Sequence, residues 1–338
     1  MKILYHLATL PPKLPQAEAI SQEIAALRRH FDSEQIWINP NHRSPIFIPR
    51  LLFGFHKLKQ IRAQEQTVTL HHFYNPDPFP FPYLRRLRRP VIYSITCGVA
   101  DKRPNVNFLR TMDGLVVSDE RSAARLRAWG LERVFLVRAA IEAERFSHTP
   151  LPLGSDIRLM VASAPWTLAQ FQTKGVEALL EAARREPRLR LVFLWRGVLT
   201  TTMQQRVAEL GLAEQVQVIN QQVEVNQVLA GVHATITLAT DTGIIKAQPH
   251  SLLDSLAAGK PVLVSRAIPM ADYVEAAGCG VVVENVASEA ILTAIEQLRE
   301  NYPAMQRVAQ RAGQEDFTQE AMLASYRQMY EQVMGVSL

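Results

Sequence analysis

The chain has 338 residues, which is more than one ordinary domain and favours two. Its 48% apolar and 20% charged residues are typical of a globular protein with an ample core, and no stretch approaches the ~20 consecutive apolar residues that span a bilayer. Residues 1–8 lack the long apolar segment and cleavage site of a secretory signal. The two cysteines, Cys97 and Cys279, form no metal or disulfide pattern, so we expect a cytoplasmic protein.

The net charge of +5 conceals an asymmetry. Residues 1–150 carry 22 Lys and Arg against 13 Asp and Glu, or +9, and the remainder carries 15 against 19, or −4. The basic residues include Arg50, Lys57, Lys59 and Arg62, and the run from Arg85 to Arg89. This half either faces an anionic partner, such as a membrane or an acidic substrate, or is a solvated basic surface.

The first half reads as alternating strands and helices. Residues 2–8 predict a buried strand, and Ile20, Ile24, Leu27 and Phe31 then recur at helical spacing. Apolar runs rich in β-branched residues predict further strands at 68–73, 90–95, 115–118 and 134–137, with a helix between 118 and 134.

The second half repeats the pattern after residues 148–156, whose turn formers make them the best linker candidate. The predicted strands are 157–162, 189–194, 216–219, 234–239, 261–265 and 280–283, and the predicted helices are 176–185, 203–210, 251–258 and an amphipathic tail at 317–333. Helices after strands at this spacing form right-handed parallel crossovers. We therefore predict an α/β protein with two doubly wound, Rossmann-like domains, residues 1–150 and 151–316, whose ligands lie beyond the carboxyl ends of the strands.

The segment from Lys246 to Ser265 is the most informative. Ser251 opens a predicted helix, and Asp254 three residues later resembles the second half of a capping box. Free N–H groups at a helix start, together with the helix dipole, attract phosphate. Spacing alone leaves two interpretations open, a capped core helix or a phosphate site.

This segment resembles the donor-binding signature of retaining glycosyltransferases of family 4, which have the two-domain GT-B fold. In that family two glutamates, with seven residues between them, precede a small-Gly-x-Pro-Val stretch. Lys246 and Asp254 stand at the two glutamate positions, and residues 258–262 match the end closely. Three further stretches resemble family elements in the right order: Lys174-Gly175, residues 137–146 and residues 317–320. The resemblance implies that a C-terminal helix, about 317–338, crosses back onto the first, acceptor-side domain.

The resemblance also implies roles for particular residues of the donor-binding domain. The residues expected at the donor diphosphate are Lys174, Arg196, Ser251 and Leu252. Those expected at the ribose and sugar are Lys246, His250 and Asp254. Those expected at the base are Trp166, Asn220 and Val223. Two of them carry open alternatives. Trp166 either covers a sugar or base face or anchors a domain interface, and Arg196 is either a second cation or an exposed turn residue.

In the first domain the resemblance is thinner. Relatives carry a Gly-Gly turn where this chain has Pro11-Pro-Lys-Leu-Pro15, and a histidine where it has Thr96-Cys-Gly98. His71 and His72 are predicted to end a strand near the same edge, and with Thr96 they are the weak catalytic candidates. No Asp-x-Asp motif and no cluster of His and Cys at ligand spacing is present, so we expect no metal and no cofactor.

Taken together, the sequence predicts a metal-independent enzyme of polysaccharide biosynthesis that transfers a hexose from a nucleotide-sugar to a glycan or lipid-linked acceptor, with retention of configuration. An anionic membrane surface is the further expected partner, reached through the basic N-terminal half, and nucleic acid is not expected. The altered signature leaves two alternatives. One is a catalytically weakened protein of the same fold that binds a sugar nucleotide or glycan, and the other is a sugar-nucleotide epimerase.

Overall fold

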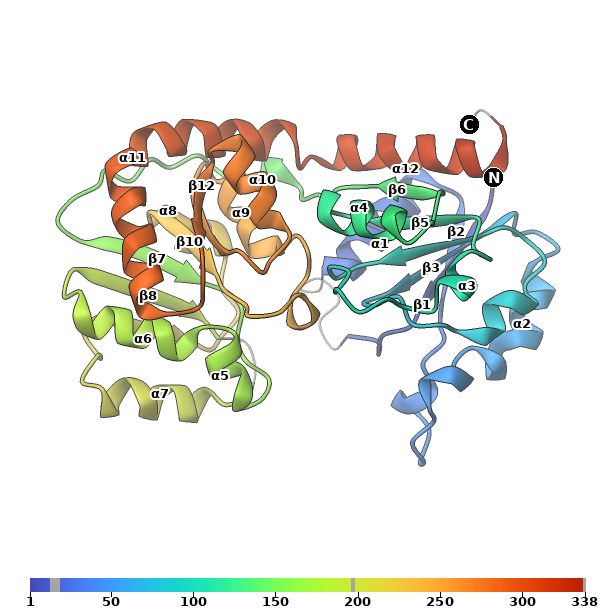
Figure 1. Ribbon diagram of the computed structural model, residues 1–338, viewed down its shortest axis with the longest axis horizontal. Coiled ribbons are helices and arrows are strands. Elements are labelled where there is room, and N and C mark those ends of the chain that lie inside the picture. The colour runs from blue at the N-terminus through green and yellow to red at the C-terminus, as the bar shows by residue number, and fades with distance from the viewer. Residues whose placement is uncertain (13–18, 196–197, 337–338) are drawn as a thin grey trace. The chain divides into compact units, whose positions relative to one another are not determined.

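The structure is a computed structural model that describes residues 1–12, 19–195 and 198–336. Its contacts divide the chain into two units, Met1–Ala139 with Gln319–Leu338, and Ala140–Thr318. Each unit contains one six-stranded sheet flanked by helices (Figure 1). All neighbouring strands are parallel, which confirms the predicted fold class of two doubly wound parallel sheets. Among the described residues, no helix is both long and apolar enough to cross a membrane.

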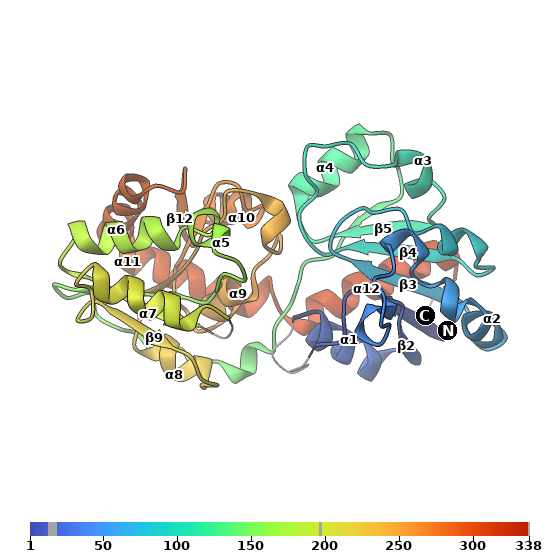
Figure 2. The same cartoon turned by 90° about the horizontal axis from the view of Figure 1, so that it is seen from below.

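The first sheet has the order β2-β1-β3-β4-β5-β6. Every residue of β1, β3 and β4 is buried, as expected for parallel strands covered on both faces. Figure 2 shows α3 and α4 on one side of this sheet and α1 and α12 on the other. The elements are β1 (Ile3–Leu7), α1 (Ala19–His30), β2 (Ser33–Trp37), η2 (Pro40–His42), η3 (Arg50–Leu52), η4 (Phe55–Lys57), α2 (Leu58–Gln64), β3 (Leu70–Asn75), η5 (Pro82–Arg86), β4 (Val91–Ile95), α3 (Val106–Leu109), β5 (Gly114–Val117), α4 (Glu120–Ala128), β6 (Val134–Leu136) and α12 (Gln319–Met334).

The second sheet has the order β12-β11-β10-β7-β8-β9. Strands β8 and β9 are added on one side of β7, and β10, β11 and β12 are added on its other side. The topological switch point therefore lies between β7 and β10. Ligands of open parallel sheets bind outside the carboxyl ends of the strands at such a point. The elements are η6 (Ala143–Arg145), β7 (Ile157–Val161), α5 (Ala169–Thr173), α6 (Val176–Arg185), β8 (Leu189–Leu194), α7 (Thr200–Glu209), β9 (Val216–Ile219), α8 (Val225–Ala230), β10 (Ala234–Thr237), η7 (Thr242–Ile244), α9 (His250–Ala257), β11 (Val262–Ser265), α10 (Met270–Ala277), β12 (Gly280–Val283) and α11 (Ser288–Glu315).

The division between the units falls earlier in the chain than the linker that we predicted at 148–156. Residues before and within that stretch already pack on the second unit. Ile141 forms a parallel bridge with Thr318, and the buried Lys260 ammonium donates a hydrogen bond to the Thr149 carbonyl at 2.6 Å. Turn-rich composition indicates an irregular segment but does not reveal which sheet it packs against.

Helix α11 packs on α9 at a position where only glycine fits. A Cβ atom on Gly313 would lie 2.3 Å from the backbone carbonyl carbon of Leu256, and backbone atoms cannot rotate away. We therefore expect Gly313→Ala to lower the free energy of unfolding by about 1–3 kcal/mol, as overpacked cores do. Denaturant unfolding would measure it, with Gly154→Ala as the matched control, because no atom lies within 4 Å of a Cβ there. Equal stabilities of the two variants would contradict this account of the packing.

Candidate functional site

Three segments of the second unit meet at the carboxyl ends of β7 and β10. The amide of Thr240, beyond β10, donates to the carbonyl of Thr173 at the end of α5, at 2.9 Å. The hydroxyl of Thr237, the last residue of β10, lies 3.3 Å from that of Ser251 in the first turn of α9. The switch point is therefore bordered by the loop after β7, the junction of α5 and α6, and the start of α9.

Lys174 is held at this site by the glycine that follows it. Gly175 has a φ of +71°, and a Cβ atom there would lie 2.6 Å from the Leu238 side chain beyond β10. Only glycine combines this left-handed backbone with so close an approach. The turn thereby fixes Lys174 against the carboxyl end of β10.

The Lys174 ammonium is buried without an ionic partner. The residue is 8% exposed, and its Nζ donates to the carbonyl of Ala164, in the loop after β7, at 3.3 Å. Desolvation lowers the pKa of Lys174 from its ordinary value of 10.5. No carboxylate of the described residues pairs with it. A buried cation with a neutral partner only is costly, and a bound anion would offset that cost.

The predicted capping box at the start of α9 is wrong. The helix begins at His250, so Ser251 is its second residue, and the N-cap is Pro249, whose side chain can accept no hydrogen bond. Ser251 bonds the Thr237 hydroxyl instead. Within the described part of the chain, the amides of His250 and Ser251 have no acceptor. This helix start, unlike a capped one, retains two donors for an anion.

Leu252, unlike the two residues before it, has neither a free amide nor a partly exposed side chain. Its amide donates to the Pro249 carbonyl at 2.9 Å, and its side chain is fully buried in the core. Of the residues that we predicted at the diphosphate, Lys174 thus brings an ammonium to the switch point and Ser251 a free amide. The amide of Leu252 is not free, because it donates to Pro249. Arg196 lies outside the described residues.

The predicted sugar and ribose residues lie on or just before α9. Burial lowers the pKa of His250 to about 3, and the positive charge of Lys246 acts in the same direction, which places Lys246 near that imidazole. His250 is therefore neutral at physiological pH and able both to donate and to accept a hydrogen bond. Asp254 is four residues after His250, so the two lie on the same face of the helix, and both are partly buried.

The residues predicted at the base are not gathered in one place. The side chain of Trp166, in the loop after β7, is 67% exposed, and its backbone amide is fixed by Gln170 Oε1 at 2.7 Å. Asn220 and Val223 follow the edge strand β9, and β8 separates that strand from β7. Val223 packs instead on an apolar cluster that includes Leu229 of α8. Trp166 is thus beside the switch point, and the other two residues are farther along the sheet.

In the first unit, the predicted position of the two adjacent histidines is wrong. Strand β3 begins at Leu70 and continues to Asn75, which pairs with Ile95 of β4. His71 and His72 therefore lie near its amino end, far from the carboxyl edge that binds ligands. Tyr74 and Asn75 extend the strand beyond the apolar run from which we had set its end.

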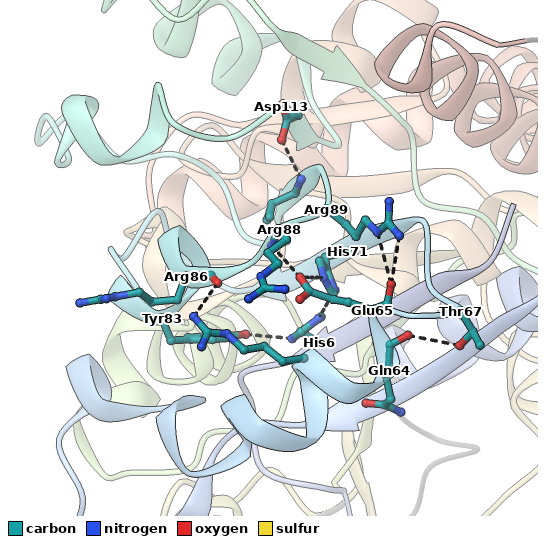
Figure 3. Close-up of polar contacts among 12 residues, drawn as sticks. His6, Gln64, Glu65, Thr67, His71, Tyr83, Arg86, Arg88, Arg89 and Asp113 are labelled. Atoms are coloured by element: carbon teal, nitrogen blue, oxygen red, sulfur yellow. Dashed lines mark hydrogen bonds and ion pairs between the residues drawn. The ribbon is translucent and has the colours of Figure 1, made fainter.

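Both histidines are fully buried and use both ring nitrogens. His72 contacts the Tyr330 hydroxyl of α12 and the Ser94 hydroxyl, each at 2.7 Å. His71 contacts His6 at 3.0 Å and the Glu65 carboxylate at 3.2 Å, as Figure 3 shows. With no exposed surface and no unused nitrogen, these side chains hold the core together and have no access to a substrate.

Thr96 lies directly after β4, at the carboxyl edge, as predicted. Its amide donates to the Asn75 carbonyl at 2.9 Å, and its hydroxyl oxygen is buried without a hydrogen-bond partner among the described residues. Sequence reasoning missed the ion pair nearby, in which Arg50 contacts Asp77 at 2.6 Å and lies 4.2 Å above the Phe79 ring. The Pro and aromatic loop at 75–82 was the available signal, but nothing in the sequence connected it to Arg50.

In the part of the chain that the structure describes, no three His, Cys, Asp or Glu side chains are grouped as metal ligands would be. The polar groups at the switch point of the second unit are instead an ammonium, two free amides, a hydroxyl and a neutral imidazole. Such a set suits a phosphorylated ligand.

Residues 168–315, which contain Lys174 and all of α9, match the family described as glycosyl transferases group 1. The match covers less than half of the chain and shows that this segment is similar to group 1 glycosyl transferases. The resemblance to glycosyltransferases of the GT-B type is thereby confirmed, and the match covers the side of the site formed by α5, α6 and α9. No curated protein sequence matches the chain.

Solved GT-B structures have the same fold over nearly the whole chain. Sucrose-phosphate synthase from Thermosynechococcus elongatus superimposes with a TM-score of 0.76 at 15% identity, covering 99% of both chains. Anabaena HepE in complex with UDP-glucose has a TM-score of 0.68 at 14% identity, covering 99% of this chain and 100% of that one. The lipopolysaccharide outer core galactosyltransferase WaaB has a TM-score of 0.72 at 13% identity, covering 98% and 99%. At these identities the likeness establishes the fold and not the substrate.

Proposed function

We propose that this protein transfers a hexose from a nucleotide-sugar to an acceptor hydroxyl, with retention of configuration and without a metal. The observation that carries the proposal is the switch point of the second unit, where Lys174 is buried without an anionic partner among the described residues and the amides of His250 and Ser251 have no acceptor there. The family match over residues 168–315 supports glycosyl transfer as the reaction class.

In this proposal the protein stabilises the negative charge of the leaving group. As the bond from the anomeric carbon to the diphosphate breaks, negative charge grows on the nucleoside diphosphate. The Lys174 ammonium and the amides at the start of α9 would stabilise that charge in a water-poor site. Asp254 would hold the ribose hydroxyls, and Trp166 would cover the sugar or base.

Lys246 sets this chain apart from the signature that it resembles. An ammonium cannot accept hydrogen bonds from sugar hydroxyls, as a glutamate does. Its proximity to His250 at the start of α9 suits a contact with a phosphate or with an acidic sugar such as a uronic acid. We therefore propose that the donor presents an additional negative charge at this position.

A glycan or a lipid-linked molecule is the proposed acceptor, and the cytoplasmic face of a membrane is the proposed location. Two observations support this choice. Residues 1–150 carry a net charge of +9, and WaaB, which has the same fold, is a lipopolysaccharide galactosyltransferase. A role in polysaccharide biosynthesis follows from such an acceptor.

A binding protein of the same fold is the second candidate. Lys246 in place of a glutamate favours it, as does the placement of His71 and His72 in the core, which leaves Thr96 as the only one of the three first-unit candidates at the carboxyl edge. The two functions differ in products, since a binding protein neither transfers the sugar nor hydrolyses the donor. An epimerase, the third candidate, would convert the donor without an acceptor and release no nucleoside diphosphate in steady state.

The test is a thermal-shift panel of UDP-, GDP-, ADP- and TDP-sugars, followed by an assay of nucleoside diphosphate release with the best ligand. A ligand at 100 times its dissociation constant should stabilise the protein by ~2.7 kcal/mol. Release that depends on an acceptor supports the transferase. Binding without release would favour the binding protein, and no stabilisation by any nucleotide would overturn the site.

The charge at Lys246 gives a further expected result. Lys246→Glu should weaken binding of the intact donor about tenfold more than Lys246→Gln does, because the reversal places a carboxylate near the diphosphate. Calorimetric titration of both variants would measure the difference. Wild-type affinity in both variants would mean that Lys246 makes no contact with the donor.

A further inference from the structure

One segment of the first unit combines exposed apolar side chains with uncompensated positive charge. Residues 35–64 contain no Asp or Glu but five cations, Arg43, Arg50, Lys57, Lys59 and Arg62. We call residues 40–59 the protruding segment, because Figure 1 shows this blue part of the chain extending away from the first sheet before it returns in α2.

The apolar surface of the described chain is concentrated here. Five of its ten large exposed apolar side chains fall between residues 46 and 55. Ile46 is 68% exposed and Phe47 80%, and the other three are Leu51, Leu52 and Phe55. Single exposed apolar residues are ordinary, whereas several within one short segment indicate an interaction surface.

The base of the protruding segment is fixed while its apolar side chains remain in solvent. The Asn41 side chain accepts from the Ile48 amide at 2.8 Å and donates to the Ile48 carbonyl at 3.1 Å, which closes the loop carrying Ile46 and Phe47. Phe53 is buried in the core of the sheet. Gly54, with a φ of +83°, approaches Tyr83 so closely that a Cβ atom would lie 2.5 Å from its ring. The exposure is thus a property of an anchored loop.

The charges around this apolar group are available to a partner. Arg50 is occupied, because it pairs with Asp77. Arg43, Lys59 and Arg62 are exposed and Lys57 is partly so, and none of the four forms an ion pair within the described ranges. Exposed apolar side chains on an anchored loop, with cations near them in the chain, match the two layers of an anionic bilayer, its acyl boundary and its headgroups.

We propose that the protruding segment inserts Ile46 and Phe47 into the interface of an anionic lipid bilayer, with Arg43, Lys57, Lys59 and Arg62 against the headgroups. The inference deepens the membrane part of the proposed function and rests on it only in taking a lipid surface as the partner of the first unit. An acidic protein partner would pair with the cations, but it would not explain why Ile46 and Phe47 are so strongly exposed.

Vesicle sedimentation tests the proposal. Wild-type protein should bind phosphatidylcholine vesicles containing phosphatidylglycerol, and should bind pure phosphatidylcholine much less. The double variant Ile46→Ser/Phe47→Ser should reduce binding to the anionic vesicles about tenfold or more. Removing two cations in Lys57→Gln/Lys59→Gln should reduce it by about fivefold per residue at low salt, and less at high salt.

Matched controls separate these effects from general changes in the chain. Val336→Ser removes an apolar side chain that is 50% exposed elsewhere in the first unit, and Arg307→Gln/Arg311→Gln removes two exposed cations from α11. Both should bind vesicles as wild type does. Equal binding by the Ile46 and Phe47 variant and by wild type would overturn insertion, as would negligible binding of wild type to both vesicles, the result expected if the segment contacts a protein.

A fluorescent probe gives a direct measure of insertion. Phe47→Trp should acquire a blue-shifted emission with anionic vesicles and be quenched by brominated lipids, beyond the signal of the four native tryptophans. An unquenched probe on bound vesicles would overturn the proposal. Nucleotide thermal shifts of these variants should equal those of wild type, so a failure of the donor site and a failure of the membrane contact give separate results.

Discussion

Replacement of Lys174 by methionine should weaken nucleoside diphosphate binding by about 1.5–3 kcal/mol while leaving the ligand-free protein as stable as wild type or more stable. Both effects have one cause. The ammonium is buried and, among the residues that the structure describes, it bonds only the Ala164 carbonyl, so its burial costs desolvation energy until an anion binds. Methionine fills a similar volume without the charge. Binding of the free nucleoside, which has no phosphate, should change little.

Lys260→Met is the matched control for this variant. Lys260 is also buried, its pKa is lowered to about 8 by burial, and its Nζ bonds the Thr149 carbonyl. It follows the carboxyl end of α9, however, and thus lies away from the helix start that we propose as the phosphate site. Calorimetry with UDP and uridine, or with the matching pair from the nucleotide panel, would measure all three proteins. Equal losses in the two variants would mean that burial of a lysine, and not contact with phosphate, governs affinity.

The second sheet was predictable because its strands are short apolar runs separated by segments with helical spacing. The bounds of β8, β9, β12 and of helix α6, which precedes β8, are those predicted from apolar runs and helical spacing alone. Runs such as Leu189–Leu194 permit only one interpretation when a helix precedes and follows them. Lys174-Gly175 was singled out for a different reason, its resemblance to a Lys-Gly element of the family, and the short helix α5 before it was not predicted.

Elements that depend on tertiary contacts were missed. Strand β2 is an edge strand with a single buried residue, Ile36, so it has no apolar run. Helix α11 contains Pro303, which normally ends a helix. It continues because its apolar face is packed on both sides of that residue, with Leu298 before it and Ala309 after it among the fully buried residues. Packing energy outweighs local propensity in such helices.

The candidate site shows the same limit at single residues. Sequence spacing placed Ser251 and Asp254 in the first turn of one helix. It could not show that the helix starts one residue earlier, at His250, without a side-chain cap. Sequence spacing also could not show that strand β3 continues past its apolar run to Asn75. For this reason His71 and His72 were predicted at the carboxyl edge of the sheet, although they lie in the core. The pairing of Arg50 with Asp77 is a contact between distant loops, for which one sequence contains no signal.

The first unit should lose stability steeply in acid, and His72 should be a principal cause. Burial lowers the pKa of His72 from 6.5 to about 3. Below pH 6.5 the unfolded chain therefore takes up a proton that the folded chain refuses, so stability present above this pH is lost as the pH falls towards 3. At about 1.4 kcal/mol per pH unit, the loss over that window amounts to roughly 5 kcal/mol. The pKa values of His6 and His71 are also lowered by burial, and these groups act in the same direction.

The variant His72→Gln isolates this contribution in the slope of the free energy of unfolding against pH, and not in the stability at one pH. Glutamine does not titrate, and its amide can still bond the Tyr330 or the Ser94 hydroxyl, which both contact His72. We expect the free energy of unfolding of the variant to fall less steeply between pH 6 and pH 4, by about 1.4 kcal/mol per pH unit, even if the variant is less stable at pH 7. Urea unfolding at several pH values would measure both slopes, with His30→Gln, an exposed histidine at the end of α1, as the control. Identical slopes for wild type and His72→Gln would mean that His72 is protonated in the folded protein and that its burial between β3, β4 and α12 does not keep it neutral.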